Sequence, residues 1–81
     1  MASIRARNEK LFFDFYYNNV RCREQTTLND TKLNRSKLEK ALNHIELQIR
    51  LQRFVYRDFF PQSKRCKIFK DIDDVVSKNK E

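Results

Sequence analysis

Arg21, Arg23 and Gln25 are the residues of this chain whose types and spacing indicate chemistry. In a β-strand, alternate residues point to the same side, so a strand here places two guanidinium groups and an amide on one face. In the major groove of B-DNA, Arg pairs with guanine and Gln with adenine through two hydrogen bonds each, and a two-stranded ribbon fits the groove. The spacing therefore predicts a surface that reads duplex DNA.

The strand that carries these residues is predicted to be the second of a hairpin. Strand-like runs flank Asn18-Asn19, and Asn adopts positive φ readily enough to form a two-residue primed turn. This turn fixes the register. The predicted pairs are Tyr17 with Val20, Tyr16 with Arg21, Phe15 with Cys22, Asp14 with Arg23, Phe13 with Glu24, Phe12 with Gln25, and Leu11 with Thr26.

The polar face of this hairpin is also compatible with two roles that involve no duplex DNA. Asp14 and Arg23 lie opposite each other in the predicted register, and a cross-strand ion pair between them needs no ligand. Phe12 and Tyr16 could instead stack the bases of single-stranded nucleic acid on an exposed sheet. This last role is the weaker alternative, because RNA-recognition folds usually have more strands and glycine-containing aromatic motifs.

A third strand is predicted over residues 3–7, where polar and apolar residues alternate before the short turn Asn8-Glu9. With a continuous pleat, Ile4 and Ala6 face the core. Arg5 and Arg7 then lie on the same face as Arg21, so the polar face becomes a basic one.

One long helix is predicted from Lys32 to about Arg53, a stretch with no Gly or Pro, with Asp30 or Thr31 as its N-cap. An apolar stripe at helical spacing packs it onto the apolar face of the sheet. The stripe consists of Leu38, Ala41, Leu42, Ile45 and Ile49.

Leu33, Leu47 and Leu51 lie off this stripe. We expect the aromatic segment 54–61 to return over them, because its own rings also need burial. The alternative is an exposed second apolar side, which with residues 54–60 would serve as a protein-interaction or oligomerisation surface.

Residues 62–81 are predicted to form a flexible linker or tail, which makes residues 1–61 the folded domain. Lys64, Arg65 and Lys67 give its first part a positive charge suited to phosphate contacts, and the carboxylates of residues 71–74 are expected to be solvated.

Length and composition favour a single small α+β domain with an anionic partner. The chain has 81 residues, and its 18 Lys and Arg outnumber 11 Asp and Glu, for a net charge of +7. Cys22 and Cys66 are expected to be free thiols of a soluble intracellular protein, although a disulfide between them stays open. No signal peptide or membrane-spanning run is visible.

Catalytic and metal-binding patterns are missing from the sequence. His44 has no Ser, Cys or Asp partner at a motif spacing, and the chain contains no Gly, which excludes glycine-rich phosphate loops. We therefore expect no enzyme activity, no cofactor, no metal and no small-molecule substrate.

The chain resembles the N-terminal arm-type DNA-binding domain of phage integrases of the tyrosine recombinase class. The resemblance covers residues 2 to about 66, and the run after the Phe-rich strand is its most specific part. It rests on Ser3-Ile-Arg5, Lys10-Leu-Phe-Phe-Asp-Phe15, Val20-Arg-Cys-Arg-Glu-Gln-Thr26, Asp30-Thr31, Asn34-Arg35, Phe59-Phe60-Pro61 and Ser63-Lys-Arg65.

The resemblance implies a three-stranded antiparallel sheet backed by a helix, with the sheet in the major groove. It implies binding to arm-type sites beside neighbouring integrase protomers in a bacterial cytoplasm, with the recombinase chemistry in another domain. The matching positions are Arg5, Phe12, Asp14, Tyr16, Arg21, Arg23 and Gln25. Related sequences often have Gly where this chain has Asn19 and Gln52-Arg53, so the turn type and the end of the helix are the least determined features.

Overall fold

The computed structural model describes residues 2–78 of the chain. Its elements are β1 (Ser3–Arg7), β2 (Lys10–Tyr17), β3 (Val20–Asn29), α1 (Lys32–Arg50), α2 (Tyr56–Phe59), the 3-10 helix η1 (Lys64–Lys67) and α3 (Lys70–Lys78). The predicted α+β class with a three-stranded sheet and one long helix is confirmed. The chain divides into two compact units, Met1–Glu46 and Leu47–Glu81, and each is described by itself.

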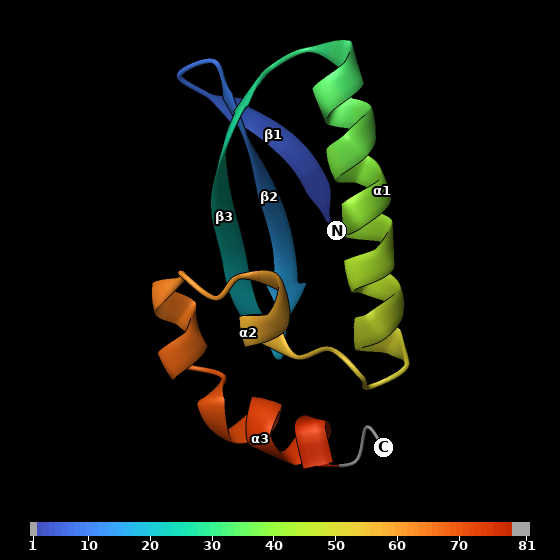
Figure 1. Cartoon of the computed structure of the whole chain (residues 1–81), viewed down its shortest axis with the longest axis vertical. Helices are drawn as coiled ribbons and strands as arrows, with labels where there is room; N and C mark the ends of the chain where they lie inside the picture. Colours follow the sequence, from blue (N-terminus) through green and yellow to red (C-terminus); the bar gives the residue numbers. More distant parts are fainter. Residues whose placement is uncertain (1, 79–81) are drawn as a thin grey trace. The chain divides into compact units, whose positions relative to one another are not determined.

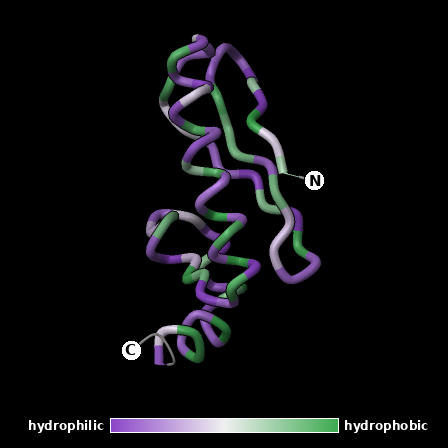
Figure 2. The backbone as a smooth tube through the Cα atoms, turned by 90° about the vertical axis from the view of Figure 1, so that its right-hand side faces the viewer, coloured by the Kyte–Doolittle hydropathy of each residue, from purple (hydrophilic) through white to green (hydrophobic). Residues whose placement is uncertain are grey.

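The first unit holds an antiparallel sheet in the order β1-β2-β3, beside which α1 runs (Figure 1). Successive side chains of a strand point to opposite faces of the sheet, and Figure 2 shows hydrophilic and hydrophobic residues along the strands. The alternation buries one set of side chains and leaves the other at the surface. The buried apolar residues of this unit are Ile4, Leu11, Phe13, Phe15, Tyr17, Cys22, Leu38, Leu42 and Ile45. Ala6, predicted to face the core, is exposed, because it lies near the end of the edge strand β1.

The predicted hairpin register is confirmed from Tyr17↔Val20 to Phe12↔Gln25. The expected pair of Leu11 with Thr26 does not form, because a bulge interrupts the ladder and the next pair is Lys10↔Asn29. At this interruption, side chains donate to the Leu11 carbonyl. The Thr26 hydroxyl donates to it at 2.7 Å and the Gln25 amide at 3.2 Å, so side chains satisfy this carbonyl.

Both hairpin turns are built without glycine. Asn8 and Glu9 have φ of 53° and 66°, and Asn18 and Asn19 have φ of 52° and 65°. Two consecutive residues with positive φ define the type I′ turn, whose twist matches that of the flanking strands. The predicted primed turn at Asn18-Asn19 is therefore confirmed.

Helix α1 begins after Thr31, whose hydroxyl accepts a hydrogen bond from the Asn34 backbone N–H at 3.1 Å. Of the two predicted caps, Thr31 is thus the one used, and Asp30 pairs with Arg35 instead. The helix ends at Arg50 and not near Arg53.

The end of α1 has the hydrogen bonds of a Schellman motif. The Arg53 N–H donates to the Gln48 carbonyl at 2.9 Å and the Gln52 N–H to the Ile49 carbonyl at 3.1 Å. Gln52 occupies the left-handed position of this motif, with φ of 58°.

The second unit is built around aromatic side chains. The Tyr56 ring lies 4.8 Å from that of Phe69 and 5.2 Å from that of Phe60, centroid to centroid. Phe54 contacts Phe59 in the same way, at 5.1 Å. These rings pack against one another, which is how the segment after α1 reaches burial.

The expectation that residues 54–61 cover the off-stripe leucines was wrong. The exposed fractions of Leu33, Leu47 and Leu51 are 66%, 43% and 50%. Residues 54–56 are buried, so these three residues offer no exposed apolar surface, and the interaction role of residues 54–60 stays a prediction.

Helices η1 and α3 occupy the stretch predicted to be flexible, as far as Lys78; residues 79–81 of the expected tail lie outside the described residues. Asp73, predicted to be solvated, is fully buried. Its carboxylate accepts hydrogen bonds from the backbone N–H groups of Tyr56 at 2.8 Å and Arg57 at 3.2 Å. The predicted division at residues 61 and 62 stays a prediction.

Candidate nucleic-acid interface

The face of the sheet opposite the buried one carries most of the sheet's positive charge. Over residues 3–25, the register puts ten residues on it, and we call this set the basic face. Arg5, Arg7, Lys10, Arg21 and Arg23 are all exposed there, against the single carboxylate of Asp14. The other members are Ser3, Phe12, Tyr16 and Gln25.

Asp14 lies near the middle of the basic face, on the central strand β2, and its side chain is only 5% exposed. Arg21 holds it with two hydrogen bonds, from Nε to Oδ1 at 3.1 Å and from Nη2 to Oδ2 at 2.8 Å. Arg5 adds a bond from Nη1 to Oδ2 at 3.3 Å. A buried carboxylate is thus enclosed by guanidinium groups from both neighbouring strands.

The predicted partner of Asp14 is the directly opposite residue, Arg23, and the structure favours Arg21 instead. Arg23 Nε is 4.0 Å from the carboxylate, beyond hydrogen-bonding distance. Arg21 and Arg5 both lie diagonally from Asp14 in the register. Because strands twist, the long side chains of diagonal neighbours reach as far as those of opposite ones.

These contacts shift the pKa values of Asp14 and Arg21 so that both charged forms are favoured. The hydrogen bonds from Arg21, helped by Arg5 and opposed by burial, lower the pKa of Asp14 from 3.8 to about 2. The same hydrogen bonds to Asp14 raise the pKa of Arg21 above its ordinary value. Asp14 is therefore ionised at neutral pH, and it holds guanidinium groups in place without cancelling the charge of the face.

Gln25 is engaged differently from the arginines. Its Nε2 donates to the carbonyls of Leu11 at 3.2 Å and Thr26 at 3.3 Å. A bidentate contact to adenine uses the amide oxygen and one of these two N–H groups. The adenine contact stays a prediction. It requires the Gln25 amide to give up a hydrogen bond to one of these two carbonyls.

The aromatic members of the basic face differ in exposure. Tyr16 is 55% exposed, whereas Phe12 is half-buried. Lys10 also belongs to the face, although it was not among the predicted site residues. Its Nζ donates to Asn29 Oδ1 at 2.6 Å, and its place next to Arg7 across the predicted turn was the signal that could have found it.

The remaining predicted site residues lie in the second unit. Lys64, Arg65 and Lys67 form η1, where the Ser63 hydroxyl accepts a hydrogen bond from the Arg65 backbone N–H at 3.1 Å. Lys64 and Lys67 are exposed, and Arg65 is half-buried. A phosphate role for them stays a prediction.

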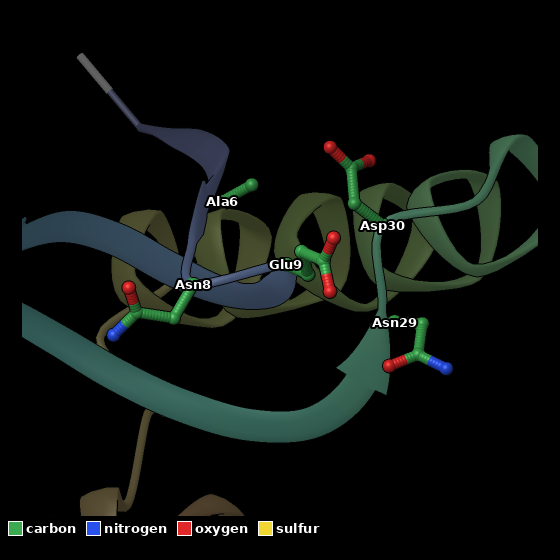
Figure 3. A pocket seen from close by; sticks show the side chains of 5 residues that line it. All are labelled: Ala6, Asn8, Glu9, Asn29 and Asp30. Carbon is green, nitrogen blue, oxygen red and sulfur yellow. The ribbon is translucent and has the colours of Figure 1, made fainter.

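A shallow hollow lies where the β1–β2 turn meets the end of β3 (Figure 3). Its side chains are Ala6, two amides and the carboxylates of Glu9 and Asp30. Negative walls repel a phosphate group. Within residues 2–78, no three His, Cys, Asp or Glu side chains gather to hold a metal ion.

Both cysteines are free thiols, Cys22 buried and Cys66 half-buried. None of the described helices is long and apolar enough to cross a bilayer.

A small α+β domain whose basic residues gather on one face of the sheet is typical of nucleic-acid-binding modules. The family model of the arm DNA-binding domain matches residues 1–64, and the chain belongs to this family. The resemblance to the arm domains of phage integrases is thereby confirmed, and DNA is the partner that the family implies. Searches of curated proteins and of solved structures returned no match.

Proposed function

We propose that the basic face binds double-stranded DNA sequence-selectively from within the major groove. The observation that carries this proposal is the segregation of charge in the first unit. Five exposed basic side chains share one face of a stiff sheet whose other face is buried. A two-stranded β-ribbon fits the major groove, and Arg is the side chain that most often reads guanine there.

The charge serves two purposes in this arrangement. Arg21 and Arg23 flank Cys22 in β3 and point to the basic face. There they would meet base edges. Arg7 and Lys10 lie at the end of the β1–β2 hairpin, where they would meet phosphates, which position the protein without reading sequence.

The test is a binding titration of labelled duplex from the attachment region of the parent element beside a scrambled duplex, at two salt concentrations. Arg21→Ala and Arg23→Ala should weaken binding to the specific duplex more than to the scrambled one. Lys67→Ala should weaken both alike and reduce the salt slope by about one.

Amide chemical shifts provide the contradicting outcome. If duplex DNA shifted only the amides of α1 and left residues 10–25 unchanged, the proposed face would be wrong. Equal affinity for both duplexes would contradict selectivity while leaving DNA binding intact.

Within this proposal, the chain acts as the arm-site-binding domain of a site-specific phage integrase during DNA integration and recombination in the bacterial cytoplasm. The arm DNA-binding family supplies the binding role, so the catalytic residues of the recombinase would belong to another domain. Arm-site binding would then help to position neighbouring integrase protomers.

A second candidate function is protein interaction through α1. Leu47 on α1 and Leu51 just after its end are one helical turn apart, and their exposed fractions are 43% and 50%. Sedimentation velocity over a range of concentrations tests this: self-association that Leu47→Lys abolishes would support it. A monomer at every concentration would argue against self-association through this surface.

A further inference from the structure

Arg21 is held in a way that leaves a specific edge of its guanidinium available. A guanidinium has five N–H donors on three nitrogens. Asp14 takes the Nε hydrogen and one hydrogen of Nη2, at 3.1 Å and 2.8 Å. The donors of Nη1 and the other hydrogen of Nη2 form the opposite edge.

The exposed fractions of the two side chains indicate that this edge is the accessible one. The Asp14 side chain is 5% exposed, whereas that of Arg21 is 42% exposed. The carboxylate is therefore beneath the surface of the basic face and the outer edge of the guanidinium is at it. Two parallel N–H groups directed outward match the O6 and N7 acceptors of guanine, whereas adenine presents an N–H donor at the position of O6.

We propose that Arg21 reads a guanine in the major groove and that Asp14 is the positioning residue that fixes Arg21 for this contact. The inference rests on the proposed function and adds the base and the supporting residue. A carboxylate just beneath a surface that binds an anionic ligand weakens that binding, since it repels phosphates. Its use is to hold a flexible side chain in its binding conformation before DNA arrives.

Neither neighbouring arginine holds Asp14 in this way. Arg5 makes one hydrogen bond to Asp14, at 3.3 Å, and Arg23 Nε lies 4.0 Å away. A single bond leaves the guanidinium plane able to rotate about it, so the bidentate contact with Asp14 distinguishes Arg21 from both.

The experiment begins by selecting binding sites from a random duplex library with the wild-type chain. Arg21→Ala should remove the preference for guanine at one position of the selected motif, by roughly tenfold relative to adenine. Asp14→Asn should reduce the preference at the same position and leave the other positions unchanged. In the Arg21→Ala background, Asp14→Asn should have no further effect at that position.

Charge is separated from positioning by a matched variant. Asp14→Asn and Glu46→Gln each remove one negative charge, and Glu46 is exposed on α1. Neither should lower the affinity for scrambled duplex, and only Asp14→Asn should lower the guanine preference. Amide spectra of each variant establish that the sheet is folded.

If Asp14→Asn does not fold, Asp14→Glu takes its place, since Glu keeps the charge but its extra methylene displaces the guanidinium that the carboxylate holds. Asp14→Glu should also reduce the guanine preference at that position. An unchanged preference in Asp14→Asn or in Asp14→Glu would overturn the assignment while sequence-selective binding stands. Failure to select any motif would instead contradict the proposed function itself.

Discussion

The carboxylate of Asp73 and the backbone N–H of Tyr56 are joined by a 2.8 Å hydrogen bond that ties α3 to the first turn of α2. The second carboxylate oxygen accepts the Arg57 N–H at 3.2 Å. Helix N-termini leave such N–H groups without intrahelical partners, and here an aspartate from a later helix satisfies them. Asp74 adds an ion pair with Arg57 at 2.8 Å.

Asp73→Ala is therefore expected to destabilise the second unit. It leaves two N–H groups without their acceptor in a buried environment, a loss of about 2–3 kcal/mol. Hydrogen exchange at the amides of Tyr56 and Arg57 should accelerate strongly. Asp71→Ala, at an exposed site of the same helix, is the control, and equal exchange in both variants would contradict the capping role.

The Asp14 ion pair makes stability depend on acid pH. The folded pKa of Asp14 is about 2, below its ordinary value of 3.8. Folding therefore favours the ionised form, and this stabilisation is complete above about pH 5 and is lost as the pH falls toward 2. Because its arginine partners are partly exposed to water, we expect a contribution of about 1–2 kcal/mol.

Denaturant unfolding of wild type and Asp14→Asn measures this contribution. The difference in unfolding free energy should be largest at neutral pH and shrink toward pH 2, where Asp14 is itself protonated. Glu46→Gln supplies the reference for removing a carboxylate from an exposed helix site. A difference independent of pH would rule out the electrostatic origin.

Gln52 occupies a backbone conformation that suits glycine. Its φ is 58° in the Schellman motif that ends α1, and the left-handed region is unfavourable for residues with a Cβ atom. Gln52→Gly should stabilise the chain by about 0.5–1 kcal/mol in thermal or denaturant unfolding. Lys40→Gly, in the middle of α1, should destabilise by about 1 kcal/mol, so a loss at both positions would contradict the assigned motif.

The two hairpin turns offer a graded version of the same test. Glu9 and Asn19 have nearly equal φ, 66° and 65°, but Asn tolerates this region better than Glu. Both Glu9→Gly and Asn19→Gly should be stabilising, by roughly 0.5–1 kcal/mol, with the larger gain at Glu9. Thermal unfolding of the two variants decides the order, and a larger gain at Asn19 would show that backbone strain is not the controlling factor.

Features with a local cause were predictable from the sequence. The period of two in residues 10–25 and the Asn18-Asn19 turn together set the hairpin register, because both act between near neighbours. The stripe of Leu38, Leu42 and Ile45 likewise predicted the buried side of α1. The family membership followed from the same local strings.

Features that depend on distant residues were not predictable in this way. Nothing near Asp73 in the sequence shows that two N–H groups 16 and 17 residues earlier need its carboxylate. The bulge opposite Leu11 was not predictable either, since more and less exposed residues of β3 alternate through it without a break. Leu47 and Leu51 stayed exposed because the later aromatic residues packed among themselves.

The sequence by itself determined which side chains share the basic face, since alternation along a strand is a property of the backbone. Only the tertiary structure decided which arginine holds Asp14. That choice depends on the twist between strands and on the reach of long side chains, which brings the diagonal Arg21 to 2.8 Å and leaves the opposite Arg23 at 4.0 Å.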